Sequence, residues 1–171
     1  MMPTLTLSLP EDKILFTPGP LTTSLTVKRA MLRDLGSRDT EFIGIVRNIR
    51  QRLLELGGVR PGDYEAILMQ GSGTFAVESV ISSVIPPDGK LLVIVNGAYG
   101  RRIEQMARVL KIASVELTFP ENQTPVLSEI EAVLTGDQAI THVAVIHCET
   151  TTGLINPIKP IGLLAQKYGK R

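Results

Sequence analysis

One almost unbroken apolar segment, KLLVIVN at residues 90–96, places the tightest constraint on the fold of this 171-residue chain. Because polar residues hardly alternate in it, a strand formed here must be buried on both faces, as strands of parallel sheets are. Residues 115–119 and 140–147 are two further predicted strands, and segments with helical periodicity lie between and after the three. Strands that alternate with helices predict an α/β fold with a mostly parallel sheet and right-handed crossovers.

A glycine-rich turn precedes this region. Residues 66–69 (AILM) are a predicted buried strand, residues 71–74 (GSGT) are a turn, and apolar residues with helical spacing follow up to Ile85. The first N–H groups of a helix have no internal partner and the helix dipole favours negative charge there, so this arrangement predicts a phosphate-binding turn. The alternative is a plain strand–helix turn with Thr74 as the helix cap.

Upstream of the turn, the sequence predicts a loose arm at residues 1–25 and a helical segment at residues 26–58. Two helices are expected in that segment, at residues 26–35 with Gly36 as the stop and at residues 40–56 with Gly57 as the stop. Residues 59–171 are then the sheet-containing large domain.

Composition excludes several functional classes. A net charge of +1 gives no reason to expect nucleic-acid or anionic membrane partners, and the Arg101–Arg102 pair is interpreted as solvated surface at a helix start. No apolar run approaches the ~18 residues of a membrane span. Cys148 is the single cysteine, which excludes an intrachain disulfide and favours a reducing compartment. The first 13 residues lack the basic region of a secretory signal, so we expect a cytoplasmic protein.

Three turns follow predicted strands, at residues 71–74, 96–100 and 148–153. Ligands of open α/β sheets bind beyond the carboxyl ends of the strands, so these turns are expected to converge on a site. Tyr99 is suited to stack on an aromatic ligand or, alternatively, to anchor its turn. The threonines at 150–152 offer hydroxyls to a ligand or, alternatively, stabilise a polar turn.

His142, His147 and Glu149 lie within eight residues, which raises the question of a metal site. A spacing of five places the two histidines on opposite faces of a regular strand, so structural roles are predicted and no metal is expected. Glu149 is expected to hold its own loop.

Four segments carry a resemblance to a known family: 14–25 (ILFTPGPLTTSL), 68–78 (LMQGSGTFAVE), 95–101 (VNGAYGR) and 147–157 (HCETTTGLINP). In this order and spacing they resemble the class V aminotransferases, which use pyridoxal 5'-phosphate, and the resemblance covers about residues 13–171. It implies part of the three-layer αβα large domain of the fold-type I, aspartate-aminotransferase-like fold.

The resemblance also implies roles for individual residues. The cofactor phosphate would be held by Ser72, Gly73 and Thr74. The pyridine ring would stack on Tyr99, with Thr150 near its phenolic oxygen. The substrate pocket would be bordered by Thr17, Pro18, Gly19 and Pro20.

Within the class, the similarity is to members that transfer the amine of 2-aminoethylphosphonate to pyruvate, giving phosphonoacetaldehyde and L-alanine, usually as homodimers. The Schiff-base lysine, the aspartate for the pyridinium nitrogen and the arginine for the substrate carboxylate are expected beyond residue 171. No catalytic residue is therefore predicted among residues 1–171, and the chain is expected to be an N-terminal portion.

Other functions remain open at this point. The chain could be a non-catalytic protein that binds pyridoxal phosphate or phosphate, or that dimerises with a full-length partner. It could belong with another class V enzyme, such as one acting on alanine and glyoxylate, or be an unrelated α/β phosphate binder.

Overall fold

The computed structural model describes residues 13–17 and 21–171. The chain divides into two compact units, residues 1–68 and 69–171. The predicted boundaries at residues 25 and 58 remain a prediction. The first unit contains α1 (Leu25–Ala30) and α2 (Thr40–Leu56). The second contains, in order, α3 (Gly73–Val84), β1 (Lys90–Val95), α4 (Ala98–Val109), β2 (Ala113–Thr118), α5 (Leu127–Gly136), β3 (Ile140–Val145), β4 (Cys148–Glu149), β5 (Leu154–Ile155) and α6 (Ile158–Lys167).

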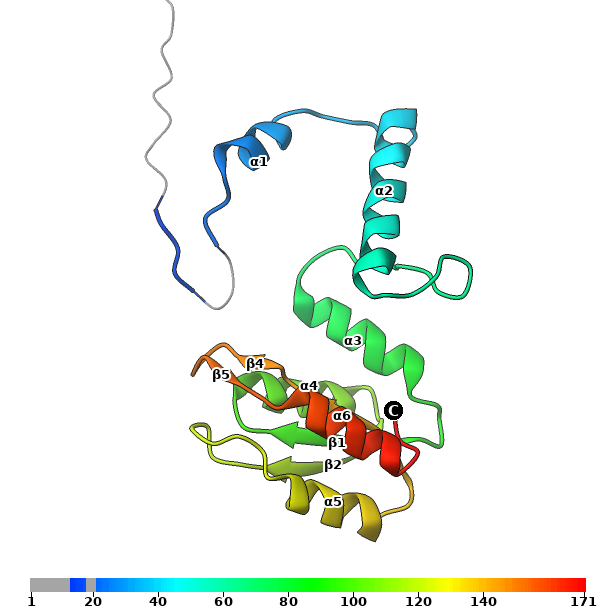
Figure 1. Ribbon diagram of the computed structural model, residues 1–171, viewed down its shortest axis with the longest axis vertical. Helices are drawn as coiled ribbons and strands as arrows, with labels where there is room; N and C mark the ends of the chain where they lie inside the picture. Colours follow the sequence, from blue (N-terminus) through cyan, green and yellow to red (C-terminus); the bar gives the residue numbers. More distant parts are fainter. Residues whose placement is uncertain (1–12, 18–20) are drawn as a thin grey trace, which may run out of the picture. The chain divides into compact units, whose positions relative to one another are not determined.

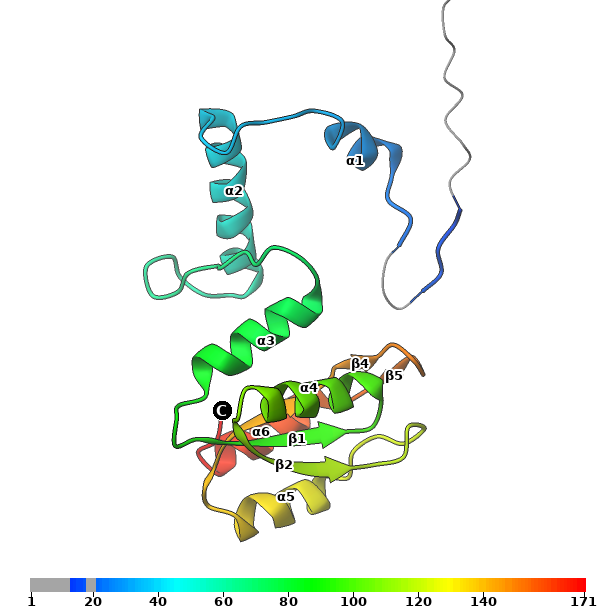
Figure 2. The same cartoon turned by 180° about the vertical axis from the view of Figure 1, so that it is seen from behind.

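The second unit is built on a parallel sheet of three strands in the order β2-β1-β3. Lys90 is in register with Ala113 of β2 and Ile140 of β3, and a register shift follows on the β3 side. The α4 and α5 helices lie on opposite sides of the strands in both views (Figure 1, Figure 2). The predicted α/β class with a parallel sheet is confirmed.

The two faces of the sheet carry separate cores. On one face, Leu91, Val93 and Val95 of β1 pack with buried residues of α3 and α4, among them Ile81 and Ile103. On the other face, Leu92 and Ile94 pack with residues of α5 and α6, namely Ile130, Leu134 and Ile161. Three layers result, and β1 is buried on both faces because each side chain from Leu91 to Val95 enters one of two cores.

After β3, the chain forms a small antiparallel pair of strands, β4 with β5. Gly153 turns the chain between them with φ = +72°, a left-handed conformation that glycine adopts readily. Both views show this pair at the end of the sheet toward which the β1 arrow points (Figure 1, Figure 2). The predicted loop at residues 148–153 is this turn together with β4.

The predicted strand at residues 66–69 was wrong, because this segment forms no strand. Ile67 is 79% exposed, and the carbonyl of Ala66 accepts a hydrogen bond of 2.8 Å from Arg50 Nε instead of from a neighbouring strand. The apolar run resembles that of β1, but no described strand pairs with it.

Helix predictions in the first unit are correct for α2 and too long for α1. The α2 helix ends at Leu56 as predicted, with Gly57 as its C-cap. The α1 helix ends at Ala30, and Met31 is its C-cap, five residues before the predicted stop at Gly36. The apolar stripe that suggested a longer helix lacks a core here, since two of its members, Val27 and Met31, are exposed.

Within residues 13–17 and 21–171, no helix combines the length and apolar character needed to cross a bilayer.

Truncation of a β1 side chain tests this core. We expect Leu92→Ala to lower the free energy of unfolding by about 2–5 kcal/mol, because Leu92 is fully buried and the change leaves a cavity. Urea unfolding followed by circular dichroism measures it. The control is Val109→Ala on the exposed side of α4, and an equal loss in both variants would contradict the assignment of Leu92 to the core.

Candidate functional site

Glu149 connects two of the three predicted loops. Its carboxylate is fully buried, and it accepts hydrogen bonds from the backbone N–H groups of Tyr99 (3.2 Å) and Gly100 (2.9 Å) in the first turn of α4. These N–H groups have no partner within the helix, and the helix dipole favours a negative charge at this position. The side chain of Glu149 therefore caps α4.

Glu149 is predicted to hold its own loop, and its backbone does so. The carbonyl of Glu149 accepts bonds from the N–H groups of Gly153 (2.7 Å) and Thr152 (3.3 Å). The side chain, in contrast, reaches a helix 50 residues earlier in the chain. One residue thus fixes the turn after β3 and attaches it to the start of α4.

Gly97 provides the space for this contact. A Cβ atom at residue 97 would lie 2.5 Å from both the carboxyl carbon and Oε2 of Glu149. The φ of Gly97 is 177°, an extended value that any residue adopts, so the requirement for glycine here is one of space. A side chain at this position would force the buried carboxylate away from the helix.

Beside this cap, Asn96 and Asn156 form a buried amide pair. Each side-chain amide donates to the other's carbonyl oxygen, at 2.7 and 2.9 Å. Asn96 also donates to the carbonyl of Gln123, and Asn156 to the carbonyl of Ile146. The pair links the segments that follow β1, β2 and β3, so the carboxyl ends of all three strands are tied together.

The start of α3 is the predicted phosphate-binding turn. Gly71 has φ = +76°, and Ser72 is the N-cap residue but makes no side-chain cap bond. Phe75 and Ala76 donate to the carbonyl of Ser72, whereas the N–H groups of Gly73 and Thr74 have no acceptor in the described part of the chain. The alternative with Thr74 as cap was wrong, since Thr74 lies inside the helix. Two N–H groups at the helix start are thus available to an anion.

Arg102 joins this turn to α4. Its Nη1 donates to Thr74 Oγ1 at 3.2 Å, and its guanidinium carbon lies 4.9 Å from the centroid of the Tyr99 ring. From the sequence alone, Arg102 was predicted only to be solvated surface, so neither contact was predicted. A spacing of three from Tyr99, on one helix face, was the available signal.

The remaining predicted site residues are less closely connected. Thr150 is partly buried directly after the capping Glu149, and no described contact joins it to Thr74 or Tyr99. Thr17 belongs to the other unit, and Pro18, Gly19 and Pro20 lie outside the described residues. The roles of Thr150 and of residues 17–20 therefore stay predictions.

His142 is buried in β3, with Nδ1 at 2.8 Å from Thr141 Oγ1 and with Nε2 lacking a partner. Burial, and secondarily the charge of Arg171, lowers the pKa of His142 below its ordinary value. In the described part of the chain, no three His, Cys, Asp or Glu residues are grouped so as to hold a metal ion.

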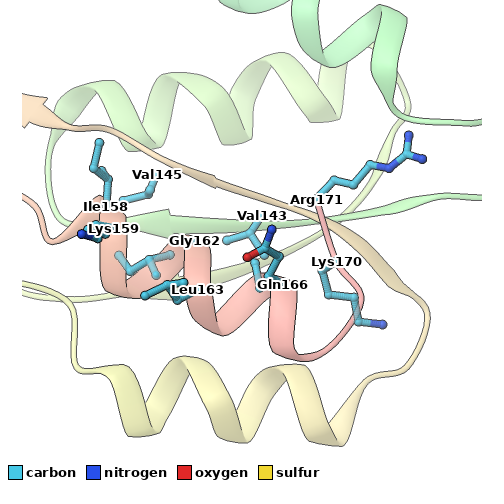
Figure 3. Close-up of a pocket in the computed structure, with 11 residues that line it drawn as sticks. Val143, Val145, Ile158, Lys159, Gly162, Leu163, Gln166, Lys170 and Arg171 are labelled. Atoms are coloured by element: carbon cyan, nitrogen blue, oxygen red, sulfur yellow. The ribbon is translucent and has the colours of Figure 1, made fainter. Parts of the chain in front are cut away.

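A cavity of about 590 Å³ lies elsewhere, beside β3 and α6 (Figure 3). Apolar side chains such as Val143, Val145 and Leu163 line much of it. Arg171 runs along the same strand, donating to the carbonyl of Thr141 (3.0 Å) and accepting from the N–H of Val143 (2.8 Å). Its polar lining residues are Lys159, Gln166, Lys170 and Arg171, but the lining is mostly apolar, so we consider this cavity a weaker anion-site candidate than the start of α3.

The parallel sheet, the capped α4 and the open start of α3 define an α/β protein with a candidate anion site beyond the carboxyl ends of its strands. The description of the class-V aminotransferase family matches residues 23–170. The chain belongs to this family.

Two curated relatives are 2-aminoethylphosphonate–pyruvate transaminases. The one from Bacillus cytotoxicus is 54% identical over 157 residues and the one from Lysinibacillus sphaericus is 50% identical over 156. These alignments cover 92% and 91% of this chain but only 43% of each relative. The chain therefore spans less than half the length of the relatives it matches, and it corresponds to their N-terminal part.

Solved structures agree on the fold. Pyridoxamine–pyruvate aminotransferase from Mesorhizobium loti matches with a TM-score of 0.82 and 25% identity, over 92% of this chain and 40% of that one. Alanine–glyoxylate aminotransferase from Nostoc sp. matches with a TM-score of 0.81 and 25% identity, over 99% and 44%. The predicted partial fold-type I aminotransferase fold is confirmed.

Substitution of Gly97 tests the Glu149 cap. We expect Gly97→Ala to lower the free energy of unfolding by about 1–3 kcal/mol, because the new methyl group displaces a buried carboxylate from two N–H donors. Chemical denaturation measures the loss. The matched control is Gly162→Ala, which adds the same atom inside α6 with open space around it and should be neutral or stabilising. A neutral Gly97→Ala variant would contradict the cap.

The buried His142 predicts a pH dependence. Its pKa is lowered in the folded chain, so below its ordinary value of about 6.5 the unfolded chain binds the extra proton more readily. We expect stability to be highest above that pH and to fall as the pH drops through the lowered folded pKa. In His142→Asn this part of the loss should be absent. Urea unfolding of both proteins between pH 7.5 and pH 5, chosen to span the ordinary pKa, provides the comparison; parallel curves would contradict it.

Proposed function

We propose that this chain binds the phosphate of pyridoxal 5'-phosphate at the start of α3. The observation that carries the proposal is the pair of N–H groups on Gly73 and Thr74 that have no acceptor among the described residues. The hydroxyl of Ser72 makes no cap bond to its own helix, so it too can donate to a phosphate oxygen. Together with the helix dipole, these donors fit a dianion.

The neighbouring residues suit the rest of the cofactor. Tyr99 is 37% exposed at the start of α4, which leaves ring surface for stacking on a pyridine ring. Because Glu149 holds the backbone of Tyr99, that ring has a fixed attachment. Thr150 follows the same glutamate, and we assign its hydroxyl to the phenolic oxygen of the cofactor. Residues 17–20 are proposed to border the substrate pocket.

When bound, pyridoxal phosphate supplies an electron sink for the carbon that loses its proton in transamination. The residues of this chain act by holding and orienting. The α3 start fixes the phosphate end, Tyr99 fixes the ring plane, and Glu149 keeps the two loops in register.

For the whole protein, we propose transfer of the amine of 2-aminoethylphosphonate to pyruvate, giving phosphonoacetaldehyde and L-alanine. The 50–54% identity to transaminases named for these two substrates supports this choice over alanine and glyoxylate. We further propose a cytoplasmic homodimer. Formation of L-alanine from the two substrates by the whole protein tests the activity, and a preference for glyoxylate as acceptor would contradict it.

A second candidate is that residues 1–171 on their own bind the cofactor without catalysis. The position of Lys90 favours this candidate, because covalent attachment of the cofactor would need a lysine near the site. Lys90 instead begins β1, at the opposite end of the sheet from the candidate site, and its Nζ pairs with Asp137 at 2.5 Å. Lys167 likewise pairs with Glu131, at 2.6 Å. Borohydride reduction of the chain with pyridoxal phosphate, followed by peptide mass mapping, distinguishes covalent attachment of the cofactor from non-covalent binding. One defined modified lysine would indicate covalent attachment, whereas no adduct would support simple binding.

Replacement of Thr74 tests the phosphate site directly. We expect Thr74→Val to weaken binding of pyridoxal phosphate about tenfold, because it removes a hydroxyl at the helix start while keeping the side-chain shape. Equilibrium dialysis with pyridoxal phosphate and with unphosphorylated pyridoxal measures the effect. The control is Thr74→Ser, which retains the hydroxyl and should bind like the wild type. Equal wild-type affinity for the two compounds would contradict the proposed site.

A further inference from the structure

We propose that Arg102 is a binding residue for the phosphate held at the start of α3, an inference that rests on the proposed function. Its guanidinium reaches across from α4 to Thr74, the second residue of α3. It therefore places a permanent positive charge beside the two N–H groups of Gly73 and Thr74.

The unused donors of Arg102 support the assignment. A guanidinium has five N–H donors, and in the described part of the chain Arg102 uses one of them, toward Thr74 Oγ1. It forms no ion pair with a described carboxylate. Its planar, forked donors match a phosphate group, which accepts two parallel hydrogen bonds. The charge and the donors are thus available to an anion at the site.

The hydrogen bond to Thr74 has a second effect. Because Thr74 Oγ1 accepts from Arg102, the hydroxyl proton of Thr74 remains free to be donated to another group. A phosphate oxygen at the start of α3 is a suitable acceptor. Arg102 therefore acts on the anion directly and also orients the hydroxyl of Thr74 toward it.

The neighbouring arginine provides a matched control. Arg101 lies one residue earlier in the same helical turn, but its Nη1 is 3.9 Å from Glu116 Oε1 in β2. Both side chains are exposed, and replacing either arginine with glutamine removes one positive charge. Of these two arginines, only Arg102 has a hydrogen bond to the α3 start in the described part of the chain, whereas a general charge effect would appear in both variants.

The test compares Arg102→Gln, Arg102→Lys and Arg101→Gln with the wild type in equilibrium dialysis. We expect Arg102→Gln to weaken pyridoxal phosphate about tenfold and to leave pyridoxal unchanged, because pyridoxal lacks the phosphate. Arg102→Lys should restore part of the loss, since it keeps the charge but not the fork. Arg101→Gln should match the wild type. Competition by inorganic phosphate should weaken in Arg102→Gln to the same degree.

The outcomes separate the two proposals. If the wild type does not prefer pyridoxal phosphate over pyridoxal, the proposed function fails. If it does prefer it, and Arg102→Gln keeps that preference, the role of Arg102 fails while the α3 site stands. An equal loss for both compounds would show that Arg102 only supports the local structure and would also overturn the inference. Equal losses in the two glutamine variants would show a general charge effect and overturn it as well.

Discussion

The buried carboxylate of Glu149 at the start of α4 is the interaction on which this part of the structure depends. Isolated charges are expensive to bury, and here two backbone N–H groups and a helix dipole provide the compensation. The same contact positions Tyr99 in the first turn of α4 and leaves no room for a side chain at Gly97. Because β1 leads directly into α4, the cap fixes both the end of the central strand and the loop after β3. Arg102 lies about one helical turn after Tyr99, so the cap also helps to position Arg102.

The sheet could be predicted from sequence because β1 is apolar at nearly every position, and only a strand covered on both faces accounts for that. The segment 66–69 is similarly apolar but forms no strand, because a strand also needs a pairing neighbour, and composition does not report one. The length of α1 was overestimated for a related reason, since Val27 and Met31 belong to the apolar stripe but no core covers them. Local pattern identifies what a segment can form, and tertiary partners decide whether it does.

The candidate site divides in the same way. The turn at residues 71–74 could be predicted because glycines and hydroxyl residues directly before a helix are a local pattern typical of anion-binding turns. Arg102 was not visible, because its significance comes from Thr74, which lies 28 residues away in the chain. Glu149 was predicted only to hold its own loop, because no sequence pattern indicates its contact with Gly100, 49 residues earlier. Long-range polar contacts of this kind have no periodicity, so they become apparent only in three dimensions.

The amide pair of Asn96 and Asn156 has a consequence for the chemical lifetime of the protein. An asparagine followed by glycine loses its amide readily, because the next backbone nitrogen can attack the side-chain carbonyl. Asn96 precedes Gly97, but hydrogen bonds to Gln123 and Asn156 hold its side chain in a buried position. The folded chain thus protects the side-chain amide of Asn96 from this attack, and unfolding exposes it. Deamidation would replace the donating amide of Asn96 with a carboxylate that faces the carbonyl oxygens of Gln123 and Asn156, so it would remove the hydrogen bonds that connect the ends of the strands.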